Sequence, residues 1–436
     1  MKYSPKKIKK TLKNQIEDLS KNANCYCKSP SKDFTRNRKL PFEKVVEFML
    51  TKSGKSLNCE ILDFFNFSSD APTPSAFVQQ RDKINYIAFE DLFHKFTDSI
   101  KEEKLFKGYR LLAVDGSDLH VPTNRNEVSF YPGTHGQKPY NLLHLNALYD
   151  LQRRIYVDAV IQEKWGEREA FVDMIERDNS SVPAIYIADR GYESYNNMAH
   201  VIEKGNCFLI RIRDISSRGN MLSSVELPPS DEFDIDIVFN FTRKQTKECR
   251  NSKFKFIPQN VDFDYLPAKP KKHINMEPYT MKLRFSRFKI SDNSYELVVT
   301  NLDRETFSAD VLKELYAMRW GIETSFRVLK YTLALLYFHS KKTEHIFQEI
   351  FAKLTMYNFV ELIISHTIIK QNKRKLTYQV NFSCAVHICY EFFSENISPP
   401  SVEALILKHL LPIRCDSSNP RKVTTKNTVS FLYRIA

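Results

Sequence analysis

The chain has 436 residues, 42% of them hydrophobic and 27% charged, a composition that excludes a disordered protein and is typical of a soluble globular one. At about 150 residues per domain, this length predicts roughly two to four domains. The formal net charge of +13 predicts attraction to polyanions, which means nucleic acid or an anionic membrane surface.

Two features argue against a membrane or secreted protein. The most apolar long stretch, 359–369, is shorter than the roughly 20 residues of a membrane span and contains Glu361 and His366. The basic N-terminus is not followed by the apolar region of a secretory signal. We therefore expect a cytoplasmic protein without a membrane partner.

The eight cysteines are scattered and form no paired CxxC motifs, which favours reduced thiols. Cys384, His387 and Cys389 lie close together, but a zinc site needs a further pair of ligands. A buried helix face is the better interpretation of this segment.

The N-terminal part of the chain is first basic and then helical. Residues 1–30 are rich in Lys, Asn and Ser without apolar periodicity, which predicts a mobile basic arm. Residues 31–104 predict a helical DNA-binding domain: Pro41 suits a first helical turn, a second helix covers about 57–65, and Ser75 caps a third. The last two helices resemble a helix-turn-helix, with a small helical bundle as an equally compatible alternative. The polar residues that the helix-turn-helix would expose are Gln79, Gln80, Arg81 and Lys83.

From Tyr109 onward, predicted strands alternate with helices, which indicates an α/β architecture. A long helix is predicted from Ser308 to about Lys330. The predicted segments are 105–215 for the first part of a core, 216–285 for a β-rich insertion, 286–370 for the second part of the core, and 371–436 for a C-terminal helical segment with a basic tail.

Three acids are accompanied by glycine, which is rare in this chain. Of 10 glycines, three lie within two residues of Asp115, Asp189 and Glu323. Each Asp follows an apolar run that predicts a buried strand, where a carboxylate is costly unless it is paired, hydrogen-bonded or bound to a metal. A turn cap would explain either Asp alone, whereas the two together with the third acid point to a shared site.

The predicted helix around Glu323 presents a polar stripe beside an apolar one. At about 100° per residue, this stripe is roughly 80° wide. It contains Tyr316, Arg319, Glu323, Arg327 and Lys330. A solvated salt-bridge face would not explain three cations for one acid, nor Tyr316 and Trp320 beside it. An acid for a metal, with cations for phosphates, explains both.

Phosphodiester cleavage and strand transfer develop charge on the attacking and the leaving oxygen, and two Mg²⁺ ions about 3.5–4 Å apart stabilise both. Mg²⁺ prefers oxygen ligands, so carboxylates hold it. We therefore predict that Asp115, Asp189 and Glu323 bind two Mg²⁺ ions, with Mn²⁺ as an acceptable substitute.

These residues also carry a family resemblance. Tyr316, Arg319, Glu323 and Lys330 fit the Y-x2-R-x3-E-x6-K signature of the insertion-sequence-four family of DDE transposases. The sequences VDGS and ADRGY, around the two Asp residues, resemble the acidic motifs of that family, and KWGEREAF near Glu167 is similar to a recurring segment.

The resemblance implies an α/β, RNase H-like catalytic core that is interrupted by a β-rich insertion and preceded by an N-terminal helical domain. It implies Asp115, Asp189 and Glu323 as catalytic metal ligands. It implies a DNA-bound homodimer that acts on transposon ends and target, in the nucleoid of a prokaryote. The expected DNA-binding residues are Tyr316, Arg319, Lys330, Arg190, Trp320 and Arg327.

The predicted function is thus a transposase that cuts and joins DNA. Hairpin-forming relatives carry a tryptophan in the strand before the signature helix, and this strand, YELVVTNL, has none. An RNase H-like endonuclease without strand transfer is one alternative, and a domesticated DNA-binding remnant is another. The intact acids argue against the remnant.

Overall fold

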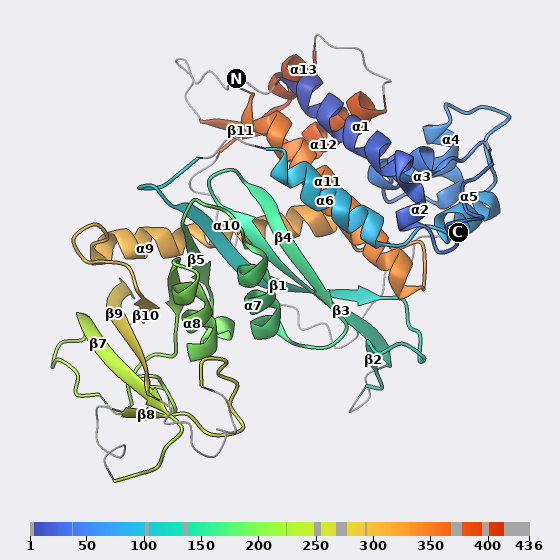
Figure 1. Cartoon of the computed structure of the whole chain (residues 1–436). Helices are drawn as coiled ribbons and strands as arrows, with labels where there is room; N and C mark the ends of the chain where they lie inside the picture. The colour runs from blue at the N-terminus through green and yellow to red at the C-terminus, as the bar shows by residue number, and fades with distance from the viewer. Residues whose placement is uncertain are drawn as a thin grey trace.

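The computed structural model describes residues 4–36, 38–100, 104–133, 138–223, 225–247, 254–266, 277–292, 294–367, 377–394 and 401–413. The expected basic tail after 413 lies outside these residues. A ten-stranded mixed sheet forms the centre of the fold. N-terminal and C-terminal helices pack together at one end of the molecule, and the β-rich segment extends at the other (Figure 1).

The sheet has the strand order β2-β3-β1-β5-β6-β10-β9-β7-β8, and β4 pairs with β3. Its central strand β1 pairs antiparallel with β3 and parallel with β5, which in turn is parallel to β6. The strands are β1 (Arg110–Val121), β2 (Phe130–Tyr131), β3 (Tyr140–Asp150), β4 (Ile155–Gln162), β5 (Ala184–Ala188), β6 (Cys207–Arg211), β7 (Phe233–Thr242), β8 (Phe254–Phe256), β9 (Tyr279–Ser291) and β10 (Ser294–Thr300). This is the mixed α/β architecture that the sequence predicts.

Helices cover both faces of the central strands, and side-chain alternation decides which residues each face receives. Leu112 and Val114 of β1 pack in the core under α7 (Glu167–Arg177) and α8 (Tyr195–Glu203). Leu111 of the same strand packs in the core under α9 (Ala309–Met318). The runs LLAV and AIYIA are buried throughout because both sides of these strands are covered.

The expected basic arm is wrong for its described residues. The structure has a helix there, α1 (Pro5–Lys21), which Ser4 caps by accepting a hydrogen bond from the backbone N–H of Lys7. Apolar residues recur every three or four positions and are buried: Ile8, Leu12, Ile16 and Leu19. The abundance of lysine concealed this stripe. A short helix, α2 (Ala23–Tyr26), follows.

The remaining N-terminal helices are α3 (Phe42–Thr51), α4 (Leu57–Phe64), α5 (Pro74–Arg81) and α6 (Ile87–Asp98). Thr73, not Ser75, caps α5. The expectation of an exposed polar face on α5 is wrong for Gln80 and Arg81, which are buried. The Arg81 guanidinium pairs with Glu349 at 3.0 Å and donates to Gln348, so this face of α5 packs against α11. That packing favours the bundle alternative.

The C-terminal part wraps around a buried helix. α11 (Thr343–Ser365) is buried along nearly its whole length and lies beside α6 (Figure 1). No helix among the described residues is long and apolar enough to cross a membrane. α12 (Phe382–Phe393) and α13 (Val402–Lys408) follow, together with a small two-stranded antiparallel sheet of β11 (Tyr378–Val380) and β12 (Leu410–Pro412) that the predicted all-helical segment did not include. On α12, Cys389 is buried and His387 is exposed, as the helix-face interpretation requires.

The predicted β-rich insertion contains β7, β8 and the first part of β9, and it extends the main sheet because β9 pairs with β10. The expected boundary at 285/286 falls inside β9, which runs unbroken over 13 residues. The insertion and the core therefore share one continuous strand.

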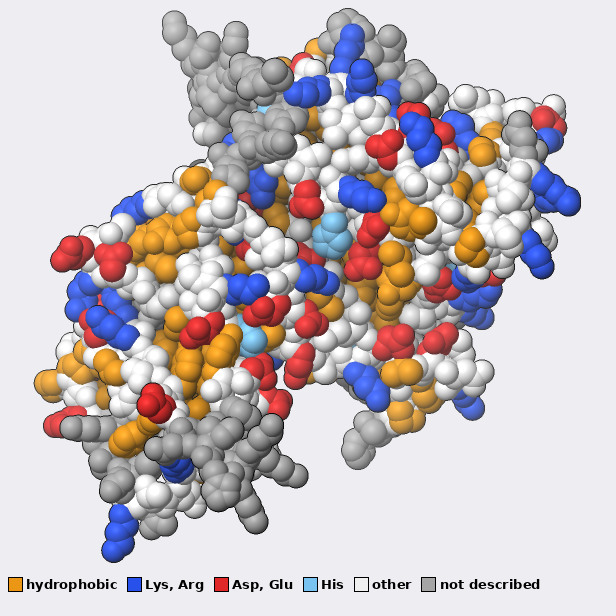
Figure 2. Space-filling model, viewed as in Figure 1, with side chains coloured by type: hydrophobic (Ala, Val, Ile, Leu, Met, Phe, Trp, Pro, Cys, Tyr) orange, Lys and Arg blue, Asp and Glu red, His pale blue; other side chains and the backbone are white. Residues whose placement is uncertain are grey.

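The net charge is not concentrated on the face seen in Figure 2, where basic and acidic side chains are interspersed.

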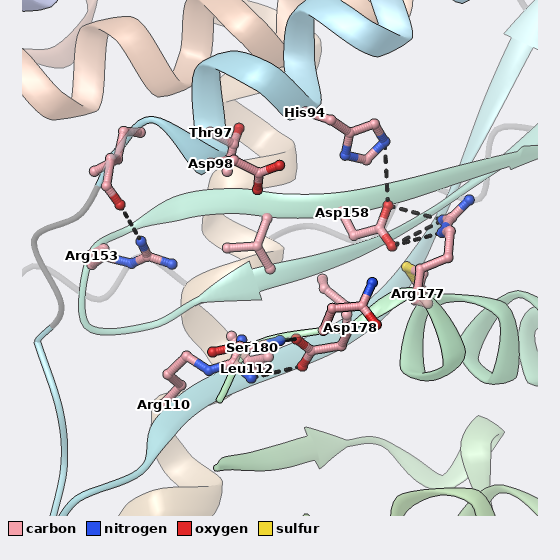
Figure 3. A pocket seen from close by; sticks show the side chains of 15 residues that line it. His94, Thr97, Asp98, Arg110, Leu112, Arg153, Asp158, Arg177, Asp178 and Ser180 are labelled. Carbon is pink, nitrogen blue, oxygen red and sulfur yellow. Dashed lines mark hydrogen bonds and ion pairs between the residues drawn. The ribbon is translucent and has the colours of Figure 1, made fainter. Parts of the chain in front are cut away.

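A cavity of about 670 Å³ lies between α6, β1 and the end of α7 (Figure 3). Two of its arginines are already paired there, Arg110 with Asp178 at 2.8 Å and Arg177 with Asp158 at 2.9 Å. The acids singled out by the sequence do not line this cavity.

Candidate active site

Asp115 of β1 and Asp189, which directly follows β5, come from two neighbouring parallel strands. Val114 pairs with Ala188 in the register of β1 and β5, and an aspartate follows each of these two residues. Alternation turns both aspartates toward the face that α9 covers, because Val114 and Ala188 point to the opposite one. Each carboxylate accepts the backbone N–H of the next residue, at 3.0 Å in Asp115 and 2.6 Å in Asp189.

The third acid reaches the same place from the predicted long helix. This helix is interrupted at Arg319, which separates α9 from α10 (Trp320–Arg327), and a π-helical turn follows at Val328–Thr332. Because α10 packs against β1, Glu323 faces the strand that carries Asp115. Tyr316 contacts Asp189, Arg319 contacts Asp115 and Glu323, and Lys330 contacts the backbone of Asp118. These members of the predicted polar stripe therefore lie on the same side of the helix.

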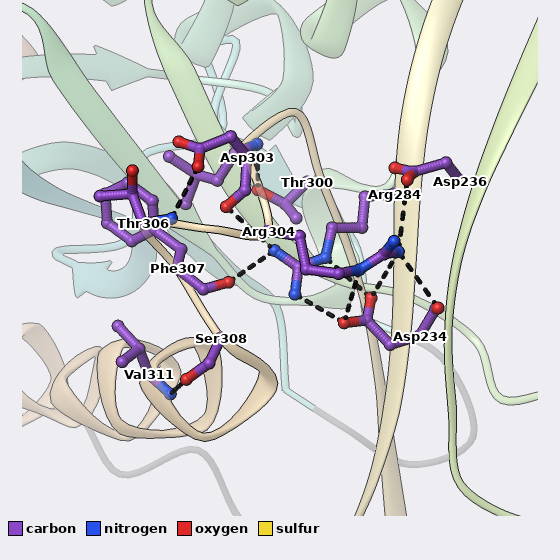
Figure 4. Close-up of polar contacts among 11 residues, drawn as sticks. Asp234, Asp236, Arg284, Thr300, Asp303, Arg304, Thr306, Phe307, Ser308 and Val311 are labelled. Carbon is purple, nitrogen blue, oxygen red and sulfur yellow. Dashed lines mark hydrogen bonds and ion pairs between the residues drawn. The ribbon is translucent and has the colours of Figure 1, made fainter.

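The start of α9 is fastened to strands β7 and β9 (Figure 4). The buried Arg284 of β9 binds both oxygens of Asp234, at 2.7 and 2.6 Å, and donates to the backbone oxygen of Phe307 at 2.6 Å. A bidentate pair of this kind holds its partners in one orientation. Since Ser308 caps α9, these contacts hold the start of the helix that carries Tyr316.

Arg319 lies among the three acids. Its Nη2 donates to Glu323 Oε1 at 2.6 Å, and its Nη1 lies 3.7 Å from Asp115 Oδ2. The side chain is only 3% exposed, and its Nε has no hydrogen-bond partner. One guanidinium thus spans the carboxylates of Asp115 and Glu323, which brings these two acids together as the sequence predicts.

Asp189 is held by different partners. The Tyr316 hydroxyl donates to its Oδ1 at 3.3 Å, and Arg211 Nε of β6 lies 3.0 Å from the same oxygen. Arg211 is a site residue that the sequence analysis missed, although its position at the end of the strand next to β5 was a usable signal.

The positive charge near the Asp115 carboxylate is too small to offset the effect of its burial. Burial raises its pKa to about 7, Arg319 opposes this rise, and the nearby charges of Glu323 and Asp189 add to it. The buried hydroxyl of Tyr192 has no partner, and its pKa is raised by burial and by the charges of Glu167, Asp115 and Asp189. This phenol therefore lies among the acids.

The three acids have the oxygen ligands that a divalent cation binds, but their side chains are not grouped around one ion position. Within the described ranges, no three His, Cys, Asp or Glu side chains are arranged to hold a metal ion. The positive charge between Asp115 and Glu323 is the guanidinium of Arg319. Three carboxylates that supply only oxygen, one of them buried with a raised pKa, match the preference of Mg²⁺, so a cation could replace the guanidinium.

The other predicted DNA-binding residues are divided between surface and interior. Arg190 and Arg327 are exposed, and Trp320 is 59% exposed with the Arg319 guanidinium 5.2 Å from its ring. Lys330 is half-buried in the π-helical turn and donates to the backbone oxygen of Asp118 at 2.8 Å. Burial lowers its pKa. Tyr316 and Arg319 are buried against the acids.

Comparison with known proteins agrees with this geometry. A family model described as "Transposase DDE domain" matches residues 106–359, more than half of the chain and the part that contains all three acids. No curated protein matches the sequence. A similar solved structure is a piggyBac transposase synaptic complex with hairpin DNA, at 8% identity over 93% of this chain and 84% of that one, with a TM-score of 0.48. On the strength of the family model, the chain belongs to the transposase DDE-domain family and is a metal-dependent DNA nuclease and strand transferase.

Proposed function

We propose that this transposase binds the ends of its insertion sequence and moves it by cutting and joining DNA. The observation that carries the proposal is that acids from β1, from the end of β5 and from α10 lie near one another, with a buried arginine paired to two of them. The signature formed by Tyr316, Arg319, Glu323 and Lys330 supports membership in the insertion-sequence-four group.

The domain organisation belongs to the same proposal. The strands β4-β3-β1-β5-β6, three antiparallel and then three parallel with β1 shared, would form an RNase H-like core. The proposed units are an N-terminal helical domain up to about 104, core segments near 105–215 and 286–370, a β-rich insertion between them, and a C-terminal segment from 371. We also propose that the protein is cytoplasmic, associates with the nucleoid and forms a homodimer on DNA.

Asp115, Asp189 and Glu323 would hold the metal ions, Mg²⁺ or Mn²⁺. Bound there, divalent cations would supply the electrostatic stabilisation that the attacking and leaving oxygens of a phosphodiester need. The chain's own residues bind and orient the DNA. Trp320, Arg190 and Arg327 are exposed around the acids and would contact the backbone, while Arg319 and Lys330 add positive charge from within.

The main role of Tyr316 would be to hold the Asp189 carboxylate in position, and contact with DNA would be secondary. Its hydroxyl already donates to this carboxylate, and its ring is buried. The backbone N–H groups of Gly116 and Arg190 orient the two aspartates in the same way. The positions of the two aspartates thus depend on β1 and on the end of β5, which is the rigid support that a catalytic group requires.

The test uses purified protein, Mg²⁺ and DNA that carries the flanking ends of the gene. Glu323→Gln removes the charge and keeps the size, so we expect cleavage to fall by at least about 10³-fold while end binding persists. Glu314→Gln, an exposed acid on α9, is the matched control and should cleave normally. Normal cleavage by Glu323→Gln would show that the helix face is only structural.

The same reactions separate the proposal from its alternative. A supercoiled target plasmid added to the cleaved ends reports joining, because only strand transfer makes covalently linked products. Cleavage without such products would favour an RNase H-like endonuclease.

A further inference from the structure

A fourth carboxylate lies near Asp115 of β1 and the end of β5, on the other face of the sheet. Glu167 begins α7, and its side chain occupies the space that a side chain at Gly116 would take. A Cβ added at Gly116 would lie 2.7 Å from Glu167 Oε1, and one added at Gly191 would lie 3.0 Å from Oε2. The carboxylate therefore sits between the two backbone segments that carry Asp115 and Asp189.

A buried amide oxygen without a hydrogen-bond partner lies beside this carboxylate. Asn146 is fully buried and pairs with Gly116 across β1 and β3. Its Nδ2 donates to Gln162 Oε1 at 3.0 Å, which turns its Oδ1 toward Gly116, 3.1 Å from where a Cβ would lie. That Oδ1 has no partner. Buried polar atoms in a folded protein nearly always have partners, so this acceptor beside a carboxylate calls for a cation or for the water bound to it.

We propose that Glu167 is a fourth carboxylate of the catalytic centre, which holds the divalent cation, directly or through water, from the face of the sheet opposite Glu323. This inference rests on the proposed function. It also explains why Gly116 and Gly191 lie beside the two aspartates: each leaves room for the Glu167 carboxylate. Asn146 acts as a positioning residue for the same cation.

A simpler role for Glu167 is to favour the positive N-terminus of α7, as acids in a first helical turn do. Two variants separate the roles. Glu169→Gln removes an exposed acid from the same turn. Glu167→Asp keeps the charge at the helix terminus but is one methylene shorter, so its carboxylate does not fill the space beside Gly116.

The experiment measures Mn²⁺ affinity of the full chain by electron paramagnetic resonance, with thermal unfolding in EDTA as the folding control. We expect Glu167→Gln and Glu167→Asp each to weaken Mn²⁺ binding about 10- to 100-fold, the range seen when a supporting group of a metal site is lost. Glu169→Gln should bind as the wild type does. In EDTA, Glu167→Gln should unfold no earlier than the wild type, because a Gln amide can donate to Asn146.

Wild-type affinity in Glu167→Asp, or equal weakening in Glu169→Gln, would overturn the proposal in favour of the helix-terminus role. If Glu167→Gln does not fold, Glu167→Asp decides the matter alone. A further variant, Asp115→Asn, distinguishes failure of the proposed function from failure of this inference. It should abolish both Mn²⁺ binding and cleavage. Cleavage by Asp115→Asn would refute the proposed function, whereas normal binding by the Glu167 variants alone would refute only this inference.

Discussion

Replacing Arg319 by Ala tests the claim that a guanidinium stands where a cation can bind. The change leaves Asp115 and Glu323 without their shared partner, whose nitrogens lie 3.7 and 2.6 Å from them. Removing one member of a buried pair costs about 3–5 kcal/mol. Glu323 is 36% exposed, so water screens part of this loss, and we expect about 2–4 kcal/mol in EDTA. At about 2.1 cal/mol/K per residue, a chain of 436 residues loses roughly 2–4 °C in Tm.

Calorimetry in EDTA and in excess Mg²⁺ measures both parts of the argument. Arg319→Ala should lose stability in EDTA and recover most of it in Mg²⁺, since the ion no longer competes with the guanidinium. Its Mn²⁺ affinity should rise while its cleavage falls, because the phosphate-binding charge is gone. Arg327→Ala, an exposed arginine of α10, is the control and should change neither Tm. An Arg319→Ala protein with unchanged Tm in EDTA and unchanged Mn²⁺ affinity would refute the reasoning.

Three further predictions follow from the burial and charge of particular residues. Burial raises the pKa of Glu361 to about 7, above its usual value of 4.5, so the fold favours its neutral form and stability should fall as pH rises through this window. Glu361→Gln should therefore raise the free energy of unfolding by about 3 kcal/mol at pH 8 and by little at pH 4.5, as denaturant titration would show. Because the pKa of Asp115 is about 7, its proton competes with metal below that pH, and Mn²⁺ affinity in titrations should fall about tenfold per pH unit from 7 to 5; a flat profile would exclude Asp115 as a ligand. Replacing the exposed Lys6, Lys7 and Lys10 of α1 by Gln should reduce the salt slope of DNA binding by about 0.9 for each phosphate that these lysines neutralise, whereas deletion of α1 should unfold the N-terminal bundle because four of its apolar residues are buried.

The sequence was most informative where a local pattern and its physical cause coincide. The apolar runs before Asp115 and Asp189 predicted two buried strands, and the structure places these strands side by side. The helix that begins at Leu57 was predicted within a residue of its observed bounds. Strong periodicity and clear breakers decide such elements without reference to the rest of the fold.

What the sequence could not provide depends on contacts between distant segments. Arg81 has the composition of a surface residue, and only Glu349, far along the chain, explains why it is buried. Arg319 is buried because it contacts acids on both β1 and α10, and a helical wheel of one segment contains no information on the contact with β1. Glu167 was noted only as part of the segment KWGEREAF, because its proximity to Gly116 and Gly191 arises only when α7 folds back on the sheet.

The position of Arg319 links the acids to the substrate. Three acids close together would repel one another, and the buried guanidinium offsets this repulsion for two of them. A divalent ion that bound the same oxygen atoms would compete with the guanidinium for them. The side chain of Arg319 also contacts the ring of the exposed Trp320, which gives it a path toward the surface. Metal binding would thus release a fork-shaped phosphate donor at the place where DNA must lie, so that the arginine of the signature serves first the acids and then the substrate.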